Sequence, residues 1–252
     1  MKLRVLGCAG AEFPGYHPPG FLVDEILLLD AGTIGAALNE VEQRQIRYIF
    51  VTHSHLDHVR GIPVLADNLV ARNVRHTVQV AGCHDTLLAL RTHLMNDVLW
   101  PDFAKLPTPQ APAIRYMELL PEQEVVVEGY SITPVPVSHT VPAVGYVVRK
   151  GGKGLFYTGD TGPTERIWAY VSGLDALIVE VSFPNDMEEV AITTGHLTPQ
   201  LLAEELKKVA ILPPRIFLTH PKPQYFALIE AEVAALGIRG VELLRDGSRL
   251  EV

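Results

Sequence analysis

Short hydrophobic runs separated by glycine and aspartate fill the first fifty residues and predict β-strands. We place these strands at residues 3–10, 21–32 and 47–53. Residues 34–44, between the last two runs, carry their apolar side chains at helical spacing. The start of the chain therefore predicts strands that are joined by a helix.

The alternation of strand and helix continues, with a strand-rich stretch in the middle of the chain. The further strands are expected at residues 77–82, 114–120, 124–129, 130–139, 144–150, 154–160, 176–182 and 215–220. The further helices are expected at residues 61–73, 85–94, 198–209 and 225–236. This order predicts an α/β protein, which some schemes call α+β, with mixed sheet packed under helices.

Residues 95–112, MNDVLWPDFAKLPTPQAP, interrupt this order because they contain four prolines and no regular period. Long structured loops in compact domains are often lids or binding loops, so we expect a lid or pocket loop here. Its aromatic residues Trp100 and Phe103 have two interpretations. They bind the substrate, as aromatic rings do when they stack on a nucleic-acid base, or they hold the loop against the core.

Length and composition favour one globular domain over residues 1–252. The chain has 252 residues, 48% of them hydrophobic, and a mean hydropathy of +0.18, which is enough apolar side chain to form a core. No segment approaches the roughly 20 apolar residues that span a bilayer. We therefore expect a cytoplasmic protein without a membrane partner.

Charge and cysteine content exclude further classes of site. The net charge is −8, and no long basic run is present, so a nucleic acid is disfavoured as a partner. Two bound divalent cations would still add local positive charge. The two cysteines, Cys8 and Cys83, are too few for a disulfide framework or a zinc site made of thiolates.

Candidate chemistry is concentrated in the loop VTHSHLDHVRG at residues 51–61. Its candidate metal ligands are His53, His55, Asp57 and His58. Closely spaced neutral imidazoles with a carboxylate suit zinc and similar divalent metals. Four more candidates lie at or after the ends of later predicted strands, and they are His139, Asp160, His196 and His220.

The number of ligands predicts two metals. Even without His196 the set holds five histidines and two aspartates, whereas one zinc site uses three or four protein ligands. A shared carboxylate between two metals leaves a position for a water whose pKa falls toward neutrality. Zinc is the favoured metal, and manganese and iron suit the same ligands. The remaining histidines are expected to be surface or locally bonded residues, and they are His17, His76, His84 and His93.

The succession THSHLDH, SH, GDTG and a late TH resembles the metallo-β-lactamase-fold hydrolases. The resemblance implies a four-layer αββα sandwich with a dinuclear site at one edge of its two sheets. It also implies the ligand sets. One metal would bind His53, His55 and His139; the other would bind Asp57, His58 and His220; Asp160 would bridge the two.

Within that superfamily the chain is similar to class II cyclic-nucleotide phosphodiesterases, through HSHLDHVRGIP, NDVLWPDF, PVSHT, GDTGPTERIW, VEVSFPN, GHLTP and THPKP. After SH the chain has TVPAVGY where those enzymes usually have glycine. The branch that cleaves phosphodiesters, which includes tRNase Z, implies catalytic roles for Glu180 and His196, with Asp57 beside them. A histidine held by a carboxylate suits general-acid work near neutral pH.

Both residues also have simpler interpretations. Glu180 could cap a local loop at the end of its strand. His196 could be an ordinary residue before a helix whose N-cap is Thr198.

The expected function is hydrolysis of a small phosphodiester, with a 3′,5′-cyclic nucleotide (cAMP or cGMP) as the favoured substrate. A metal-bridging hydroxide would attack, and His196 would act as the general acid. The alternatives are a tRNase Z-type RNA endonuclease, a thioester, lactam or lactone hydrolase of the same fold, and a non-catalytic metal-binding protein. A homodimer is the favoured oligomer.

Overall fold

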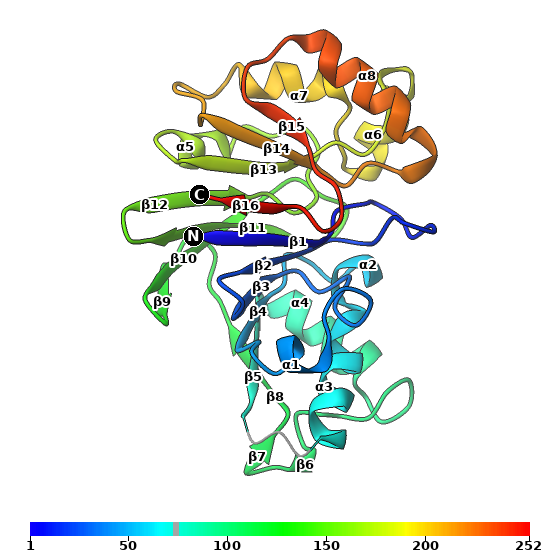
Figure 1. Cartoon of the computed structure of the whole chain (residues 1–252), viewed down its shortest axis with the longest axis vertical. Helices are drawn as coiled ribbons and strands as arrows, with labels where there is room; N and C mark the ends of the chain where they lie inside the picture. Colours follow the sequence, from blue (N-terminus) through cyan, green and yellow to red (C-terminus); the bar gives the residue numbers. More distant parts are fainter. Residues whose placement is uncertain (73–75) are drawn as a thin grey trace.

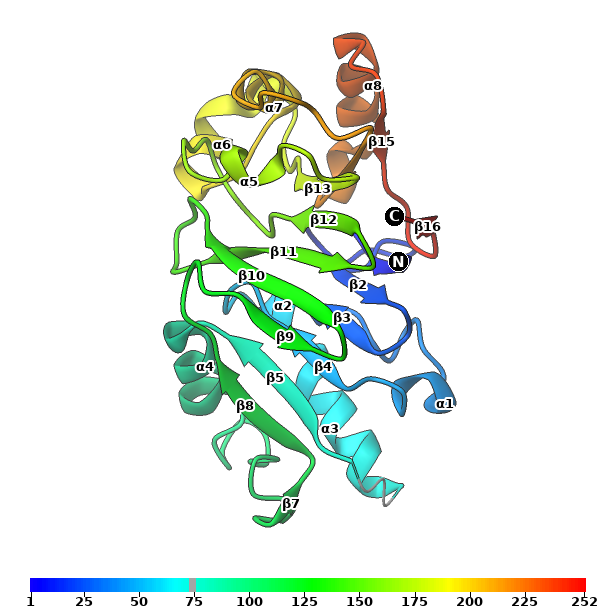
Figure 2. The same ribbon diagram turned by 90° about the vertical axis from the view of Figure 1, so that its left-hand side faces the viewer.

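Two seven-stranded sheets lie between two layers of helices in the computed structural model, which describes residues 1–72 and 76–252 (Figure 1). Each sheet has its own helices. Figure 2 shows β10, β11 and β12 with α5, α6 and α7 above them, and in the lower part of the molecule β4, β5 and β8 with α4 beside them and α3 lower down. This arrangement is the four-layer αββα sandwich that the resemblance implies.

The first sheet has the strand order β16-β1-β2-β3-β4-β5-β8. Its strands are β1 (Lys2–Gly7), β2 (Gly20–Val23), β3 (Leu27–Leu29), β4 (Tyr48–Phe50), β5 (Val78–Gly82), β8 (Ile114–Glu118) and β16 (Arg249–Glu251). The helices on its outer side are α1 (Glu40–Gln43), α2 (Leu56–Val59), α3 (Gly61–Ala71), α4 (His84–Ala89) and the π-helical turn η1 (Leu90–Leu94). Strands β3, β4, β5 and β8 run parallel to one another.

The second sheet has the strand order β15-β14-β13-β12-β11-β10-β9. Its strands are β9 (Val125–Val127), β10 (Tyr130–Pro136), β11 (Val144–Lys150), β12 (Lys153–Tyr157), β13 (Ala176–Glu180), β14 (Arg215–Thr219) and β15 (Val241–Leu243). The helices around it are α5 (Trp168–Val171), α6 (Glu188–Thr194), α7 (Pro199–Leu206) and α8 (Phe226–Leu236), with the 3₁₀ turns η2 (Asn185–Met187) and η3 (Pro223–Tyr225). Strands β12 to β15 run parallel.

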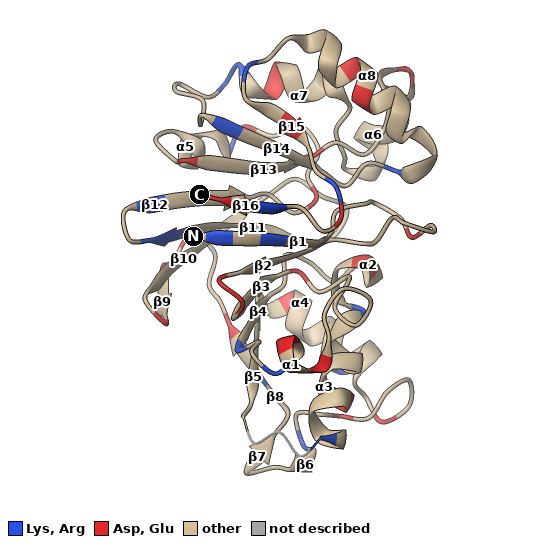
Figure 3. Cartoon of the chain, in the orientation of Figure 1, with Lys and Arg blue, Asp and Glu red and all other residues tan. Residues whose placement is uncertain are grey.

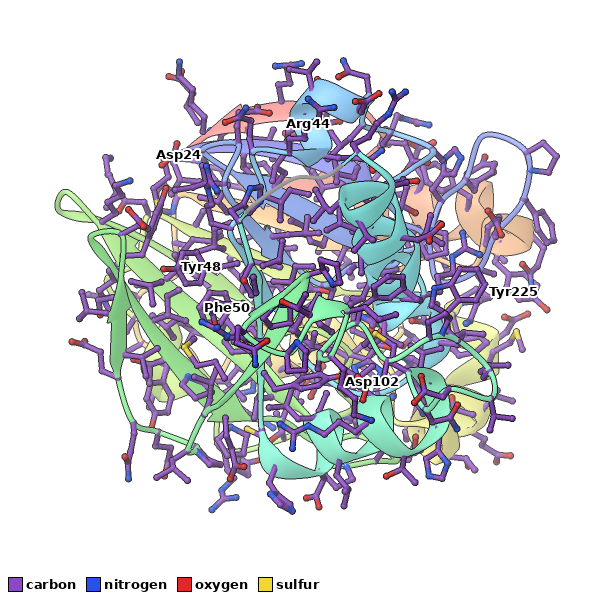
Figure 4. All side chains as sticks on the ribbon, turned by 90° about the horizontal axis from the view of Figure 1, so that it is seen from below. Asp24, Arg44, Tyr48, Phe50, Asp102 and Tyr225 are labelled. Carbon is purple, nitrogen blue, oxygen red and sulfur yellow. The ribbon has the colours of Figure 1, made fainter. Side chains whose placement is uncertain are left out.

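Alternation along the strands sorts side chains between the layers. In β3, Leu27 and Leu29 face the second sheet, whereas Leu28 faces the helices. Tyr48 and Phe50 of β4 lie on one side of their strand, two residues apart, and their ring centroids are 6.4 Å apart (Figure 4). Strands buried on both faces need apolar residues at every position, which explains the continuous hydrophobic runs in the sequence.

Two of the predicted elements differ from the structure. The expected strand at 21–32 is a hairpin, because Asp24 and Glu25 have φ angles of 45° and 63° and reverse the chain between β2 and β3. The expected helix at 34–44 is only α1. The side chain of Asn39 accepts hydrogen bonds from the backbone N–H groups of Val41 and Glu42, which starts the helix at Glu40.

The segment 95–112 is a loop as predicted, apart from a small hairpin of β6 (Pro107–Thr108) and β7 (Ala111–Pro112). Met95 and Phe103 are buried in the layer between the first sheet and its helices. Trp100 is 37% exposed. The longest helices within the described ranges have eleven residues, and none there is long and apolar enough to cross a membrane.

Candidate metal centre

The candidate metal ligands meet at the carboxyl ends of strands from both sheets. His53 follows β4 of the first sheet, and Asp57 and His58 lie in the next helix, α2, for which His55 is the N-terminal cap. From the second sheet come the residues after β10, β12 and β14, which are His139, Asp160 and His220. Because these strand ends lie at one edge of the sandwich, side chains distant in sequence share one site.

The donor atoms of these side chains form two groups. The first group is His53, His55, His139 and Asp160, and the second group is Asp57, His58 and His220. Asp160 Oδ2 lies 3.3 Å from Nε2 of His58 and 3.3 Å from Nε2 of His220, both in the second group. It also lies 3.7 Å from Nε2 of His53 in the first group. Asp160 is therefore within reach of both groups.

The residues fit divalent cations, as three orphaned buried atoms show. Nε2 of His53, of His58 and of His220 is buried without a hydrogen-bond partner, and such atoms are costly unless something compensates them. All three lie within 3.7 Å of Asp160 Oδ2. Separations of this size are expected between ligands that each lie about 2.0–2.2 Å from one zinc ion. Two divalent cations would satisfy these atoms.

Asp30, which the sequence reasoning missed, orients a ligand of the second group. Its Oδ2 lies 2.7 Å from Nδ1 of His58 and accepts hydrogen bonds from Thr52 Oγ1 at 2.8 Å and Tyr157 Oη at 2.7 Å. A carboxylate at Nδ1 leaves Nε2 free for a metal. Its position directly after the LLL run of β3 could have indicated it, because Asp160 also follows a strand.

Two ligands of the first group are held through Nδ1 in the same way. His139 Nδ1 donates to the carbonyl oxygen of Gly195 at 2.9 Å. His53 Nδ1 lies 3.0 Å from Thr52 Oγ1. Both contacts leave Nε2 to face the centre of the group, so the ring orientations are set by the protein itself.

Burial keeps the histidines of the first group neutral, because it lowers the pKa of His53, His55 and His139 below the ordinary value. Burial alone would raise the pKa of Asp160, but His220 and His58 outweigh it and hold that pKa well below its usual range. Neutral imidazoles and an ionised carboxylate are the forms that bind metals.

The second group is arranged around opposite charges. Burial alone would lower the pKa of His58, but Asp160 and Asp30 outweigh it and raise that pKa well above its ordinary value. The pKa of Asp57 is lowered despite burial by the nearby His220, whose Nε2 lies 3.4 Å from Oδ2, and by the nearby His58. These carboxylates favour positive charge at Nε2 of His58, and a bound cation would take the place of a proton there.

Glu180 and His196 form a buried pair beside both groups. Glu180 Oε1 lies 2.7 Å from Nδ1 of His196 and accepts the backbone N–H of Thr161 at 3.0 Å. A nitrogen of His196 lies within 4.8 Å of ligand atoms of Asp160 and His220. Burial alone would lower the pKa of His196, but the Glu180 carboxylate outweighs it and raises that pKa. The simpler role of Glu180 as a loop cap is also present, in its bond to Thr161.

The two aromatic candidates lie apart from the ligands. The Phe103 side chain is 2% exposed and packs in the core, so its ring has no free face for a substrate and holds the loop in place. The structure therefore does not support substrate binding by Phe103. Among the described residues no hydrogen bond or ring contact joins Trp100 to the metal groups. Substrate binding by Trp100 stays a prediction.

Three of the remaining histidines have local partners. His17 Nδ1 lies 2.8 Å from Asp246, His76 Nε2 lies 3.1 Å from the carbonyl oxygen of Ile46, and His84 Nδ1 lies 3.3 Å from Glu118. His93 is exposed. None of the four is in a metal group of the described residues.

A family model described as the β-lactamase superfamily domain matches residues 27–221. The chain belongs to this superfamily. The fold agrees, because the chain superposes on the metallo-β-lactamase fold protein YhfI from Bacillus subtilis with a TM-score of 0.79 and 21% identity over 99% of each chain. Unliganded yeast PDE1 superposes with a TM-score of 0.84 and 18% identity over 100% of this chain and 99% of the other. The predicted fold is confirmed.

Two relatives by sequence carry enzyme names. A probable 3′,5′-cyclic-nucleotide phosphodiesterase of Yersinia pestis is 28% identical over 190 residues, which cover 66% of this chain and 52% of the relative. The chain thus spans about half the length of that protein. A ribonuclease Z of Pyrobaculum calidifontis is 29% identical over 264 aligned positions, covering 89% of this chain and 88% of the relative. The prediction of a hydrolase of this superfamily is confirmed.

Proposed function

We propose that this chain is a phosphodiesterase that uses two divalent cations, with zinc favoured, to hydrolyse a small phosphodiester. A 3′,5′-cyclic nucleotide such as cAMP or cGMP is the favoured substrate. The observation that carries the proposal is the buried Glu180–His196 pair, joined at 2.7 Å beside the two groups of ligands. Hydrolysis of a diester needs a proton for the departing alkoxide, and this pair is suited to supply it.

Two divalent cations bound there would polarise the phosphate oxygens and activate a water for attack. The residues of the chain provide the rest. Asp160 lies between the groups and fixes their spacing. Nδ1 of His196 is engaged by Glu180, so Nε2 is the atom that can donate a proton to the leaving oxygen. Glu180 raises the pKa of that ring despite its burial and so favours the protonated form.

The favoured substrate class rests on size and charge. The Yersinia pestis relative is named for a cyclic nucleotide, which supports a small diester. The net charge of −8 disfavours a long RNA. Figure 3 shows how the charges are distributed. Basic residues lie on several strands, among them β1, β12, β14 and β16, and acidic residues lie on elements next to these strands.

A second candidate is an RNA endonuclease of the ribonuclease Z type. One observation favours it: the Pyrobaculum calidifontis relative matches along 88% of its length, whereas the phosphodiesterase relative matches along 52%. Both candidates use the same ligands and the same acid, so substrate preference separates them.

A kinetic comparison of cAMP, cGMP, a 2′,3′-cyclic nucleotide and a short RNA, each with the zinc-loaded protein, tests the proposal. We expect the highest kcat/KM for a 3′,5′-cyclic nucleotide. A higher value for the RNA would favour the endonuclease. An absence of turnover on every diester, including bis(p-nitrophenyl) phosphate, would reject phosphodiesterase activity altogether.

The acid role is tested by His196→Ala. This variant should keep both metals and cleave substrates with poor alkoxide leaving groups about 100-fold more slowly or worse. The loss should be much smaller on bis(p-nitrophenyl) phosphate, because p-nitrophenolate leaves without a proton. Equal losses on both substrates would remove the acid role. The homodimer and the cytoplasmic location stay predictions.

A further inference from the structure

We propose that the hydroxyl of Ser182 is a positioning group that joins the acid pair to the second metal group. The inference rests on the proposed function and deepens it, because it assigns one side chain to both halves of the site. Ser182 lies two residues after Glu180, directly beyond β13.

The hydroxyl of Ser182 touches three functional side chains at once. Ser182 is completely buried. Its Oγ lies 2.8 Å from Glu180 Oε2, 2.8 Å from Nδ1 of His220 and 3.2 Å from Nδ1 of His196. The contact therefore includes both members of the acid pair and one candidate metal ligand.

The backbone of Ser182 holds the same loops together. Its N–H donates to the carbonyl oxygen of Leu197, next to His196, at 3.0 Å. Its carbonyl oxygen accepts the N–H of Lys222, two residues after His220, at 3.1 Å. The position of the hydroxyl is thus fixed relative to both histidines.

The single proton of the hydroxyl decides how the network is arranged. A carboxylate only accepts hydrogen bonds, so the hydroxyl donates to Glu180 Oε2. Its lone pairs then accept the Nδ1–H of His220. That tautomer leaves Nε2 of His220 as a bare lone pair, and this is the buried, unpartnered atom 3.3 Å from Asp160 Oδ2. Ser182 therefore selects the tautomer of His220 that can bind a metal.

The same arrangement directs His196. Because the hydroxyl occupies Oε2 of Glu180, Oε1 is left for Nδ1 of His196, which it meets at 2.7 Å. The longer 3.2 Å contact between Ser182 and His196 is secondary. Loss of the hydroxyl would leave Oε2 with the longer hydrogen bond from the Leu197 N–H, at 3.2 Å, and would remove the acceptor of His220, so both halves of the site would change together.

The test compares Ser182→Ala with Ser182→Thr, which keeps a hydroxyl. Zinc affinity is measured for each of the two sites by calorimetric titration of metal-free protein, which needs no substrate. The rates of hydrolysis of a cyclic nucleotide and of bis(p-nitrophenyl) phosphate are then compared. The difference between the two losses measures how far the variant impairs proton donation by His196. Thr158→Val is the matched control, because it removes a buried hydroxyl whose one hydrogen bond within residues 1–72 and 76–252 goes to the neighbouring Gly159 carbonyl.

We expect Ser182→Ala to weaken the second zinc site by about 10- to 100-fold, the range for residues that orient metal ligands. Ser182→Ala should also slow hydrolysis of the cyclic nucleotide more than it slows hydrolysis of bis(p-nitrophenyl) phosphate. Ser182→Thr should restore both properties, and Thr158→Val should change neither. If the alanine variant does not fold, Ser182→Cys replaces it with the same expectations, because a thiol is a weaker hydrogen-bonding group.

Wild-type zinc affinity in Ser182→Ala, or a change in only one of the two properties, would overturn the proposed link. The same conclusion follows if the threonine variant restores nothing or if Thr158→Val has the same effects as Ser182→Ala. A failure of the proposed function is separate from these outcomes. In that case the wild-type protein hydrolyses no diester, while the zinc titrations still report the effect of Ser182 on His220.

Discussion

Asp160 is the residue on which the two metal groups converge. One of its oxygens lies within 4.0 Å of Nε2 atoms of four histidines, which are His53, His58, His139 and His220. Two cations bound among these imidazoles would compensate the nitrogens of His53, His58 and His220 that lack a hydrogen-bond partner. Removal of this carboxylate therefore affects both groups.

Asp160→Ala should lose most of both metals and nearly all activity, since the proposed shared ligand would anchor each cation. Metal content after dialysis, measured by elemental analysis, checks this. Asp175→Ala is the control, because Asp175 pairs with Lys153 at the surface. A variant of Asp160 that retains two metals per chain would contradict the bridging role.

The raised pKa of His196 predicts a pH dependence. A pKa raised in the folded state favours the protonated ring, so the acid form is present at low pH and is lost as the pH rises through that pKa. The kcat for a cyclic nucleotide should therefore fall on the alkaline side, at a pH above the ordinary histidine pKa. The kcat for bis(p-nitrophenyl) phosphate should lack this fall, because its leaving group needs no proton.

Profiles of kcat against pH for both substrates check the assignment, with His196→Ala as the reference. In that variant the slow residual cleavage of the cyclic nucleotide should no longer show this alkaline fall. If kcat falls equally at alkaline pH with both substrates, the fall belongs to a group other than His196.

At the scale of elements, the end of α6 places a first-group ligand. Gly195 ends this helix with φ 71°, and its carbonyl oxygen accepts the Nδ1–H of His139. A Cβ at this position would lie 2.9 Å from Nδ1 of His139. Gly237 ends α8 with a similar φ of 63°, but a Cβ there would meet no atom within 4 Å.

Both Gly195→Ala and Gly237→Ala should lower the melting temperature, because a left-handed alanine costs roughly 1–2 kcal/mol. Only Gly195→Ala should also weaken zinc binding at the first site, since its methyl group displaces His139. Thermal melts and zinc titrations of the two variants check this. Equal zinc affinities would show that the end of α6 does not position His139.

Periodicity predicts the longer elements of the fold and misses several short ones. The patterns predict α3, α7 and α8 and most strands of both sheets. The helices α2, α5 and α6 and the strands β15 and β16 are not predicted, because a segment of three to seven residues shows too little of a period. The turn at Asp24 and Glu25 is missed because it contains no glycine or proline, and its one turn-favouring residue, Asp24, stands between two apolar runs.

The same limit applies to the site. The ligands are recognisable because several lie within one loop and the others follow strands. Asp30 and Ser182 are missed because their roles depend on partners 28 and 38 residues away, His58 and His220. Only the packed fold brings these pairs together, so the residues that orient the ligands are harder to find than the ligands themselves.

At the scale of the whole molecule, the metal centre joins the two sheets. His53 and the ligands of α2 belong to the first half of the sandwich, and His139, Asp160 and His220 belong to the second. Each group takes ligands from both halves. Cations bound there would cross-link the sheets at the edge where the strands end, so metal binding and the packing of the sheets would stabilise each other.

Removal of the metals should therefore lower the melting temperature of the whole domain. A ligand that binds only the folded state at 1,000 times its Kd contributes about 4 kcal/mol, and about 2–4 °C per kcal/mol in a domain of this size gives roughly 8–16 °C. Thermal melts with and without a chelator, followed by addition of zinc, manganese or iron, measure the effect and rank the metals. Asp160→Ala is the control and should respond far less to the chelator, because it lacks the shared ligand. If wild-type protein that held metal before treatment melts at the same temperature after the chelator has removed it, the cations do not stabilise the packing of the two sheets.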